Sequence, residues 1–253
     1  MKIQTKITAV AASIAVASTF AFGATILKYF SPNNDGVRDV LEFPFSATDD
    51  GRIVSWKMVI ENSRGKIIRT IGNKTTLPEK ITASSVLKQI GKAKESVIIP
   101  ESVIWDGTMD DGTIAPDGEY FYYLSLTDEK GNEKKKKKYN VFIDNIAPKA
   151  TVTVPEGDAL VFGEGAKAVF HIKQTGTQEK KWTAEISDKD GNVVRTVNWE
   201  NSKPFDFTWD GTDDKGMIVP DGIYNYVLTG EDRAGNISND ASIKNIIFLV
   251  KAI

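Results

Sequence analysis

The chain has 253 residues, of which 41% are hydrophobic and 26% are charged, and its formal net charge is −2. This length and apolar content allow two domains with cores of their own, and the balanced charge excludes the broadly basic surface typical of nucleic-acid binding. There is no cysteine and one histidine, His171. Disulfides, thiolate chemistry and multi-histidine zinc sites are therefore excluded, and little is left for a Ser-His-Asp triad.

The first 24 residues predict an export signal. Lys2 and Lys6 form a short positive region, and an apolar stretch covers residues 7–22. Ala21 and Gly23 are the small residues that a signal peptidase requires, so we expect cleavage after Gly23 or Ala24. An uncleaved single-span anchor is the alternative, but the apolar run is short for that role and contains serine and threonine. We expect a signal peptide over 1–24 and no transmembrane domain after its cleavage. The mature protein is expected in the periplasm or at the cell surface, in the outer envelope.

The following segment, residues 31–42, matches the spacing of a calcium loop, with Gly36 at the sixth place, where a sharp turn is needed. The oxygen-bearing residues at ligand positions are Ser31, Asn33, Asp35, Asp39 and Glu42. Against calcium, a serine occupies the first position, Pro32 stiffens the start, and no flanking helices are expected. The alternative is a tight turn, stabilised by Asn and Asp side chains, that docks the N-terminal strand. Ca²⁺ is the one cofactor that the sequence suggests.

Alternation of apolar and polar residues with a period of two dominates the rest of the chain. Residues 41–45, 56–60 and 120–124 are examples, and glycine-containing pairs such as Asp106-Gly107 and Asp117-Gly118 mark turns between such runs. Strands at a spacing of about ten residues with a turn signal between them indicate antiparallel β-sandwiches.

A repeat divides the chain into two copies of one module. Trp105-Asp106-Gly107-Thr108 and the landmarks after it recur 104 positions later, from Trp209-Asp210-Gly211-Thr212. Upstream, residues 64–70 match residues 190–196 at an offset of 126, so the first copy holds an insertion at about 72–97. A repeat of this length is a whole domain. We expect an all-β protein of two tandem Ig-like or fibronectin-III-like antiparallel β-sandwiches, over 25–147 and 148–253.

Carboxylates gather after each repeated tryptophan, where a cation or acid–base chemistry could use them. They are Asp106, Asp110 and Asp111 in the first copy and Asp210, Asp213 and Asp214 in the second. Their spacing relative to glycine and proline fits ordinary turn chemistry better. We therefore expect a structural role for them, and we predict no catalytic residue. The repeated tryptophans, Trp105 and Trp209, are predicted to anchor the cores.

A run of five lysines occurs in the first copy alone: Lys134, Lys135, Lys136, Lys137 and Lys138. One interpretation is that their charge protects a sheet edge from aggregation. The other is that they bind a partner, either an envelope protein or an anionic envelope polymer. No run of aromatic residues stands clearly apart from the core, so a carbohydrate-binding module is not favoured.

The repeated Trp-Asp-Gly-Thr, Pro-Asp-Gly-x-Tyr-x-Tyr and Asp-x-x-Gly-Asn signatures resemble the FlgD-type Ig-like domain, which takes its name from the flagellar hook-capping protein. Residues 29–39 resemble the Phe-Ser-Pro-Asn-x-Asp-Gly-x-x-Asp lead-in found before such domains in envelope and surface proteins. The resemblance covers both copies and implies an exported bacterial β-sandwich protein without enzymatic activity. We expect a cell-envelope protein that serves as a structural spacer or protein-binding scaffold. The alternatives are a surface adhesin or matrix-binding protein and a calcium-stabilised accessory module of a secreted complex.

Overall fold

The computed structural model describes residues 28–44, 53–73, 97, 100, 102–163, 168–239 and 241–250. The predicted signal peptide and most of the predicted insertion lie outside the described residues. Within these ranges the chain is built of β-strands, with one short 3₁₀ turn, η1 (Gly157–Leu160). None of the described helical structure is long and apolar enough to span a bilayer. The all-β prediction is confirmed.

The first module is a sandwich of one large and one small sheet. The large sheet has the order β1-β8-β6-β3-β4, with β7 beside β6. Its strands are β1 (Lys28–Phe30), β3 (Ile53–Asn62), β4 (Ile67–Gly72), β6 (Gly118–Asp128), β7 (Glu133–Lys135) and β8 (Tyr139–Ile143). The small sheet pairs β2 (Leu41–Pro44) with β5 (Ser102–Trp105). Alternate side chains of both sheets, among them Phe43, Met58 and Trp105, meet in one buried core.

The second module repeats this plan with additional short strands. Its large sheet has the order β10-β17-β16-β13-β14, and two short antiparallel pairs, β11-β15 and β12-β9, cover it. The large sheet contains β10 (Val161–Phe162), β13 (Glu179–Asp188), β14 (Val193–Ser202), β16 (Gly222–Glu231) and β17 (Ala241–Phe248). The covering pairs are formed by β9 (Ala150–Val152), β11 (Phe170–Ile172), β12 (Gln174–Gly176) and β15 (Phe207–Trp209). Trp182, Trp209 and Tyr226 are fully buried at the centre of this core.

In each large sheet, the strand that comes first along the chain runs parallel to the strand that comes last along the chain. β1 pairs with β8 and β10 with β17 in this way, whereas the other pairs in both modules are antiparallel. Period-two alternation specifies the faces of a strand but carries no information on the direction of its neighbour, so this pairing could not be predicted from the sequence.

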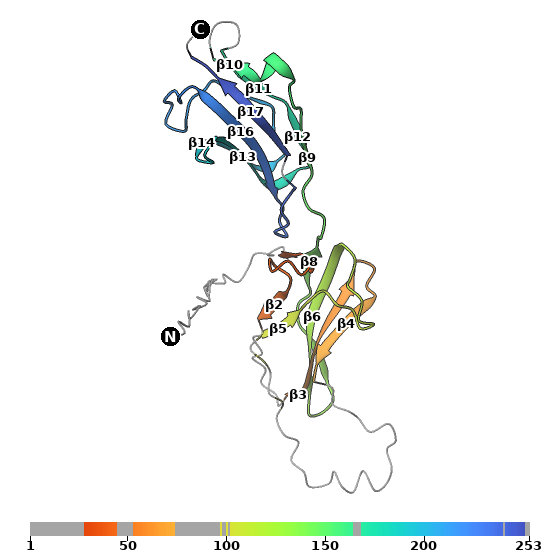
Figure 1. Ribbon diagram of the computed structural model, residues 1–253. Coiled ribbons are helices and arrows are strands. Elements are labelled where there is room, and N and C mark those ends of the chain that lie inside the picture. The colour runs from red at the N-terminus through yellow and green to blue at the C-terminus, as the bar shows by residue number, and fades with distance from the viewer. Residues whose placement is uncertain are drawn as a thin grey trace, which may run out of the picture.

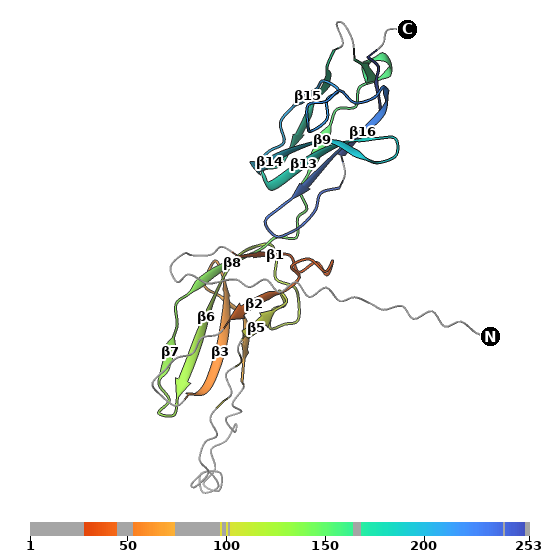
Figure 2. The ribbon, with the colours of Figure 1, turned by 90° about the vertical axis from the view of Figure 1, so that its left-hand side faces the viewer.

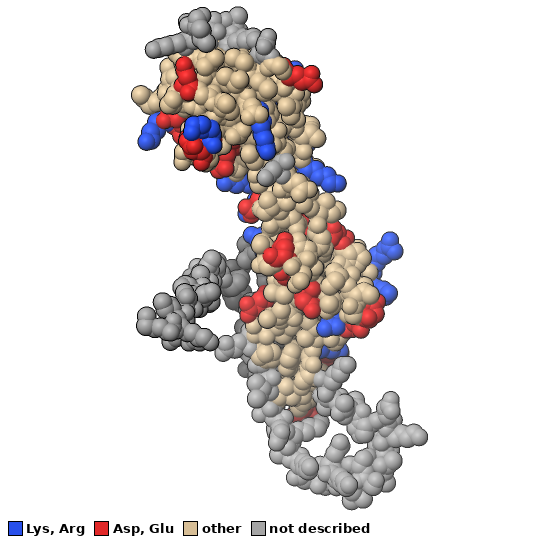
Figure 3. Space-filling view, viewed as in Figure 1, with Lys and Arg blue, Asp and Glu red and all other residues tan. Residues whose placement is uncertain are grey.

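The two modules lie end to end and make an elongated molecule (Figure 1). The view turned by 90° shows the same arrangement, with the chain crossing once from the first module to the second (Figure 2). The two hydrophobic cores share no residue. On the face shown in Figure 3, acidic and basic side chains are interspersed over both modules, which agrees with the near-zero net charge.

Candidate functional site at the junction of the two modules

The repeated Trp-Asp-Gly-Thr motif forms the same corner in both modules. Trp209 is 1% exposed, and its indole Nε1 donates to the carbonyl of Thr212 at 2.9 Å. The Asp210 carboxylate accepts from the backbone N–H and the hydroxyl of Thr212. Gly211 has a φ of 79°, and a Cβ there would lie 2.2 Å from the Phe248 ring, so no side chain fits. The motif is therefore a structural corner, and its tryptophan anchors the core as predicted.

The carboxylates after the corner cover the free edge of a strand. Asp214 donates its backbone N–H to the carbonyl of Val194 at 3.0 Å, and its side chain accepts from the N–H of Thr196 at 3.0 Å. Asp110 makes the equivalent pair of bonds to β4, with the Ile68 carbonyl and the Thr70 N–H. Polar groups on an open sheet edge invite pairing with other chains, so these aspartates block part of each edge. This role depends on residues about 20 to 40 positions apart, and no local sequence signal shows it.

The hydrogen bonds of this corner also make stability depend on pH. The Thr212 hydroxyl lowers the pKa of Asp210, as the Thr108 hydroxyl does for Asp106. A carboxyl group whose pKa is lower in the folded than in the unfolded chain stabilises the fold above about pH 4, and this stability is lost as the pH falls through the folded-state pKa. We expect the Asp210→Asn variant to lose less stability on acidification than the parent protein. Urea midpoints of the second module measured from pH 6 to pH 2 test this, and equal slopes for the two proteins would contradict it.

An Asp-x-x-Gly-Asn turn follows β6 in the first module and β16 in the second. In both, the Asn side chain donates to the Asp carboxylate, which also accepts from the Asn backbone N–H. The surroundings of the two turns differ. Asp232 and Asn236 are 3% and 4% exposed, whereas Asn132, the counterpart of Asn236, is an exposed residue. The turn of the second module is buried because it meets the first module.

Asn236 is the centre of the contact between the modules. The Ser31 hydroxyl donates to Asn236 Oδ1 at 2.7 Å, and Asn236 Nδ2 donates to the carbonyl of Asp144 at 2.7 Å. Ser31 is itself 1% exposed. The Ser31 hydroxyl also lies 3.1 Å from Asn145 Oδ1, and the Asn33 side chain donates to Asn236 Oδ1 at 3.3 Å. Removal of the Asn236 side chain leaves the buried Ser31 hydroxyl with the longer of its two contacts, at a cost of about 1–3 kcal/mol.

Arginines on both sides extend this contact. Arg38 donates from Nη1 to the backbone carbonyl of Arg233. The Arg233 guanidinium lies over the Tyr29 ring, 5.7 Å from its centroid. Gly235 packs so closely that a Cβ would lie 3.0 Å from Val37 Cγ1. Residues about 200 positions apart in the sequence thus form one interface, here called the junction.

The segment predicted as a turn or calcium loop supplies the first module's side of the junction. Asn33, Asp35 and Asp39 come together in a single turn. Asp39 accepts from the backbone N–H groups of residues 34, 35 and 36 at 2.6–3.2 Å. Ser31 instead faces the second module, and Glu42 lies on β2, where it pairs with Ile104. No group of three or more His, Cys or acidic residues placed for a metal occurs in the described ranges. Calcium binding by this loop stays a prediction.

A comparison of the two turns shows which sequence signal marks the junction. The second turn reads Asp-Arg-Ala-Gly-Asn-Ile-Ser, and the first reads Asp-Glu-Lys-Gly-Asn-Glu-Lys. Ala234, which is 0% exposed, replaces Lys130, and Ser238, which is 6% exposed, replaces Lys134. A lysine is costly to bury unless its charge is paired. The loss of lysines from one copy of a turn is thus a signal for a buried contact, although it was not used in predicting the junction.

The lysine run lies on the first module, at β7 and in the segment that joins it to β8. Lys138 Nζ lies 2.5 Å from Glu61 Oε2 and 4.9 Å from the centroid of the Phe121 ring. This ammonium group lowers the pKa of Glu61. Lys135 and Lys137 lie over the rings of Tyr123 and Tyr139 at 5.4 and 5.5 Å. Three of the five lysines therefore contact aromatic rings of their own module.

Four aromatic residues near the lysine run and the junction are at most half-exposed, and Tyr123 is only 8% exposed. Tyr29, Phe121, Tyr123 and Phe142 lie outside the described core cluster, and Tyr29 stacks on Phe142 with centroids 4.8 Å apart. In β6 both phases of the alternation carry aromatic residues, so periodicity could not separate the outer face from the inner one. Lysine and arginine side chains cover the outer rings of Tyr29, Phe121 and Tyr123. The outer face is thus not a bare aromatic platform.

Comparisons with known proteins agree with the motifs. Residues 157–234 match the model of the FlgD Ig-like domain. The basal-body rod modification protein FlgD of Salmonella typhimurium is 38% identical over 89 residues, a match that covers 32% of this chain and 38% of the Salmonella protein. The chain therefore spans well under half the length of that relative.

Two solved structures are also similar. One is FlgD of Xanthomonas campestris, a structure that concerns hook capping in flagellar assembly. It is 31% identical, and the match covers 27% of this chain and 51% of the Xanthomonas chain, with a TM-score of 0.24. The fibronectin(III)-like modules of Clostridium thermocellum CbhA are 12% identical and cover 89% of this chain and 90% of their own, with a TM-score of 0.42. Both modules are Ig-like or fibronectin-III-like β-sandwiches, and residues 157–234 of the second are similar to the FlgD-type Ig-like domain.

Proposed function

We propose that this chain is a non-catalytic protein of the bacterial cell envelope in which two Ig-like modules, divided near Pro148, act as a rigid spacer that presents a binding surface. The observation that carries the proposal is the buried junction. A flexible tether would leave the residues at both module ends exposed to water, but Ser31 and Asn236 are 1% and 4% exposed and hydrogen-bonded to each other. A spacer with a fixed angle between its modules presents partners at a fixed distance and orientation.

The lysine run supports a role in binding an envelope protein or an anionic polymer. Lys134, Lys135, Lys137 and Lys138 are exposed, and β7, which contains the first two of them, lies away from the junction (Figure 2). An exposed group of like charges attracts a polyanion, with a contribution of about 1 kcal/mol for each lysine near a charged surface. The export signal predicted over residues 1–24 is consistent with such partners.

A cross-linked pull-down from fractionated envelope tests the binding surface. We expect the parent protein to recover one partner that is lost when Lys134 to Lys138 are replaced by serine. The matched control replaces the same five residues with arginine, which keeps the charge and the cation–π contacts. Recovery of the partner by the serine variant, or its loss from the arginine variant, would contradict a charge-based contact.

Protease treatment of intact cells tests the location. A spacer in the periplasm is expected to be shielded until the outer membrane is opened. Cleavage on intact cells would instead favour the surface adhesin or matrix-binding protein that the sequence also allowed.

A further inference from the structure

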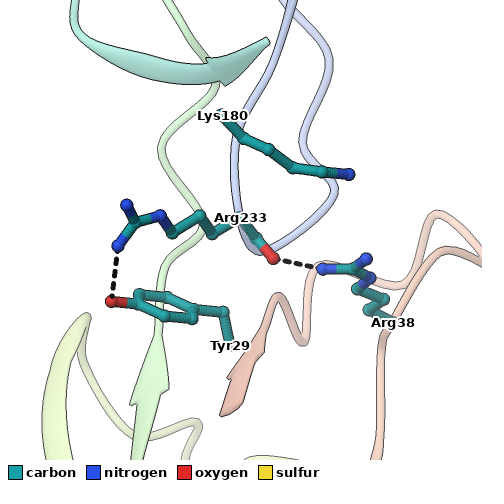
Figure 4. Close-up of a pocket in the computed structure, with 4 residues that line it drawn as sticks. All are labelled: Tyr29, Arg38, Lys180 and Arg233. Atoms are coloured by element: carbon teal, nitrogen blue, oxygen red, sulfur yellow. Dashed lines mark hydrogen bonds between the residues drawn. The ribbon is translucent and has the colours of Figure 1, made fainter. Parts of the chain in front are cut away.

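A hollow of about 360 Å³ lies at the junction, lined by Tyr29, Arg38, Lys180 and Arg233 (Figure 4). Tyr29 and Arg38 come from the first module, and Lys180 and Arg233 come from the second. Figure 4 shows the Arg233 side chain turned toward the Tyr29 hydroxyl, while its backbone carbonyl accepts the bond from Arg38. A molecule bound in this hollow would contact both modules.

The hollow carries an excess of positive charge. Lys180 pairs with Glu231 at 2.5 Å, but in the part of the chain that the structure describes neither Arg38 nor Arg233 forms an ion pair with a carboxylate. A guanidinium has five N–H donors. Arg38 uses one of them on the Arg233 carbonyl, and Arg233 uses one at 3.5 Å from the Tyr29 hydroxyl. Most of the donors around the hollow therefore remain available.

The acidic residues of the junction, Asp144, Glu179 and Asp232, do not line the hollow. Asp232 accepts three hydrogen bonds from Gly235 and Asn236 within its own turn. Asp144 accepts from the backbone N–H of Ile146. Three cationic side chains from two modules thus surround one hollow, and among the residues that the structure describes the carboxylate paired with them is that of Glu231.

We propose that the hollow binds a tetrahedral oxyanion, of the phosphate or sulfate class, held between the modules by Arg38, Lys180 and Arg233. Arginine forks match the oxygen spacing of such anions and give short, charge-assisted hydrogen bonds. The Tyr29 hydroxyl provides a further donor. The bound anion offsets the repulsion among the cations and links the two modules, so it stiffens the junction.

Titration with inorganic phosphate, monitored by two-dimensional NMR at constant ionic strength with chloride as the balancing anion, tests the site. We expect saturable shifts of the Arg38 and Arg233 side-chain N–H signals. The Arg38→Ala and Arg233→Ala variants are expected to weaken binding about tenfold or more, since one charge-assisted hydrogen bond contributes about 1.5–3 kcal/mol. A parallel titration with glycerol phosphate identifies the source of the anion. Tighter binding of glycerol phosphate indicates a phosphate ester, and tighter binding of inorganic phosphate indicates the free ion.

Two further variants provide a control outside the hollow and a second test within it. Arg64→Ala removes the same charge from an exposed turn outside the hollow and is expected to bind phosphate like the parent. Lys180→Gln removes charge from the hollow without touching the Arg38 bond across the junction, and it is expected to weaken binding. Shifts that grow linearly without saturation, or equal affinity in the Arg64→Ala, Arg38→Ala and Lys180→Gln variants, would overturn the site.

Discussion

Replacing Asn236 with alanine is expected to release the two modules from their fixed orientation. The side chain joins Ser31 and the Asp144 carbonyl to the second module through two bonds of 2.7 Å. Alanine removes both bonds and leaves the buried Ser31 hydroxyl with only its 3.1 Å contact to Asn145 Oδ1, at a cost of about 1–3 kcal/mol. The two cores share no residue, so no common core holds the angle.

Residual dipolar couplings measure this orientation directly. In the parent protein, one alignment tensor is expected to fit the amides of both modules, whereas the Asn236→Ala variant is expected to require two. Asn132→Ala is the matched control, because it removes the same bonds within the equivalent turn, which lies on the surface of the first module. A single tensor for Asn236→Ala, or two tensors for Asn132→Ala, would show that the junction does not depend on this residue.

Replacing Trp209 with alanine is expected to unfold the second module at much lower denaturant while the first stays folded. Its ring packs on Phe162, Tyr224 and Phe248 with centroids 5.1–6.0 Å apart. Truncation of a buried tryptophan to alanine costs about 3–5 kcal/mol, which is a large part of the stability of one domain. Because the cores are separate, this loss falls on one module.

Amide signal intensities in a urea series report the two modules independently. The Trp105→Ala variant is the mirror experiment, since Trp105 is 0% exposed and makes the same bond to the carbonyl of Thr108. It is expected to lower the midpoint of the first module alone. A common shift of both midpoints in either variant would show that the modules unfold as one cooperative unit.

The fold followed from features that act locally. Alternation of side chains specifies which face of a strand is buried. The corners at Gly107 and Gly211, both with a φ of 79°, require glycine. The tryptophan two positions before each of these glycines anchors the core. Because each of these signals spans only a few residues, the all-β class and the structural role of the corner carboxylates could be predicted.

The junction could not be predicted in this way. The sequence predicted a tight turn or a calcium loop over residues 31–42, and the hydrogen bonds of Asp39 occur within that span. The contact of Ser31 with Asn236 joins residues 205 positions apart. One signal was available, the loss of lysines from the second Asp-x-x-Gly-Asn turn, but it indicates burial without naming the partner.

The amino-acid sequence by itself determined the duplicated module, its strands and corners, and its likeness to the FlgD-type domain, because periodicity, glycine and tryptophan act through neighbours in the chain. The tertiary structure alone decided the parallel pairing of first and last strands, the aspartate cover on the sheet edges and the meeting of Arg38, Lys180 and Arg233 around one hollow. These features depend on how distant segments pack in space, and hydrogen bonds and charges act over a few ångströms irrespective of separation along the chain.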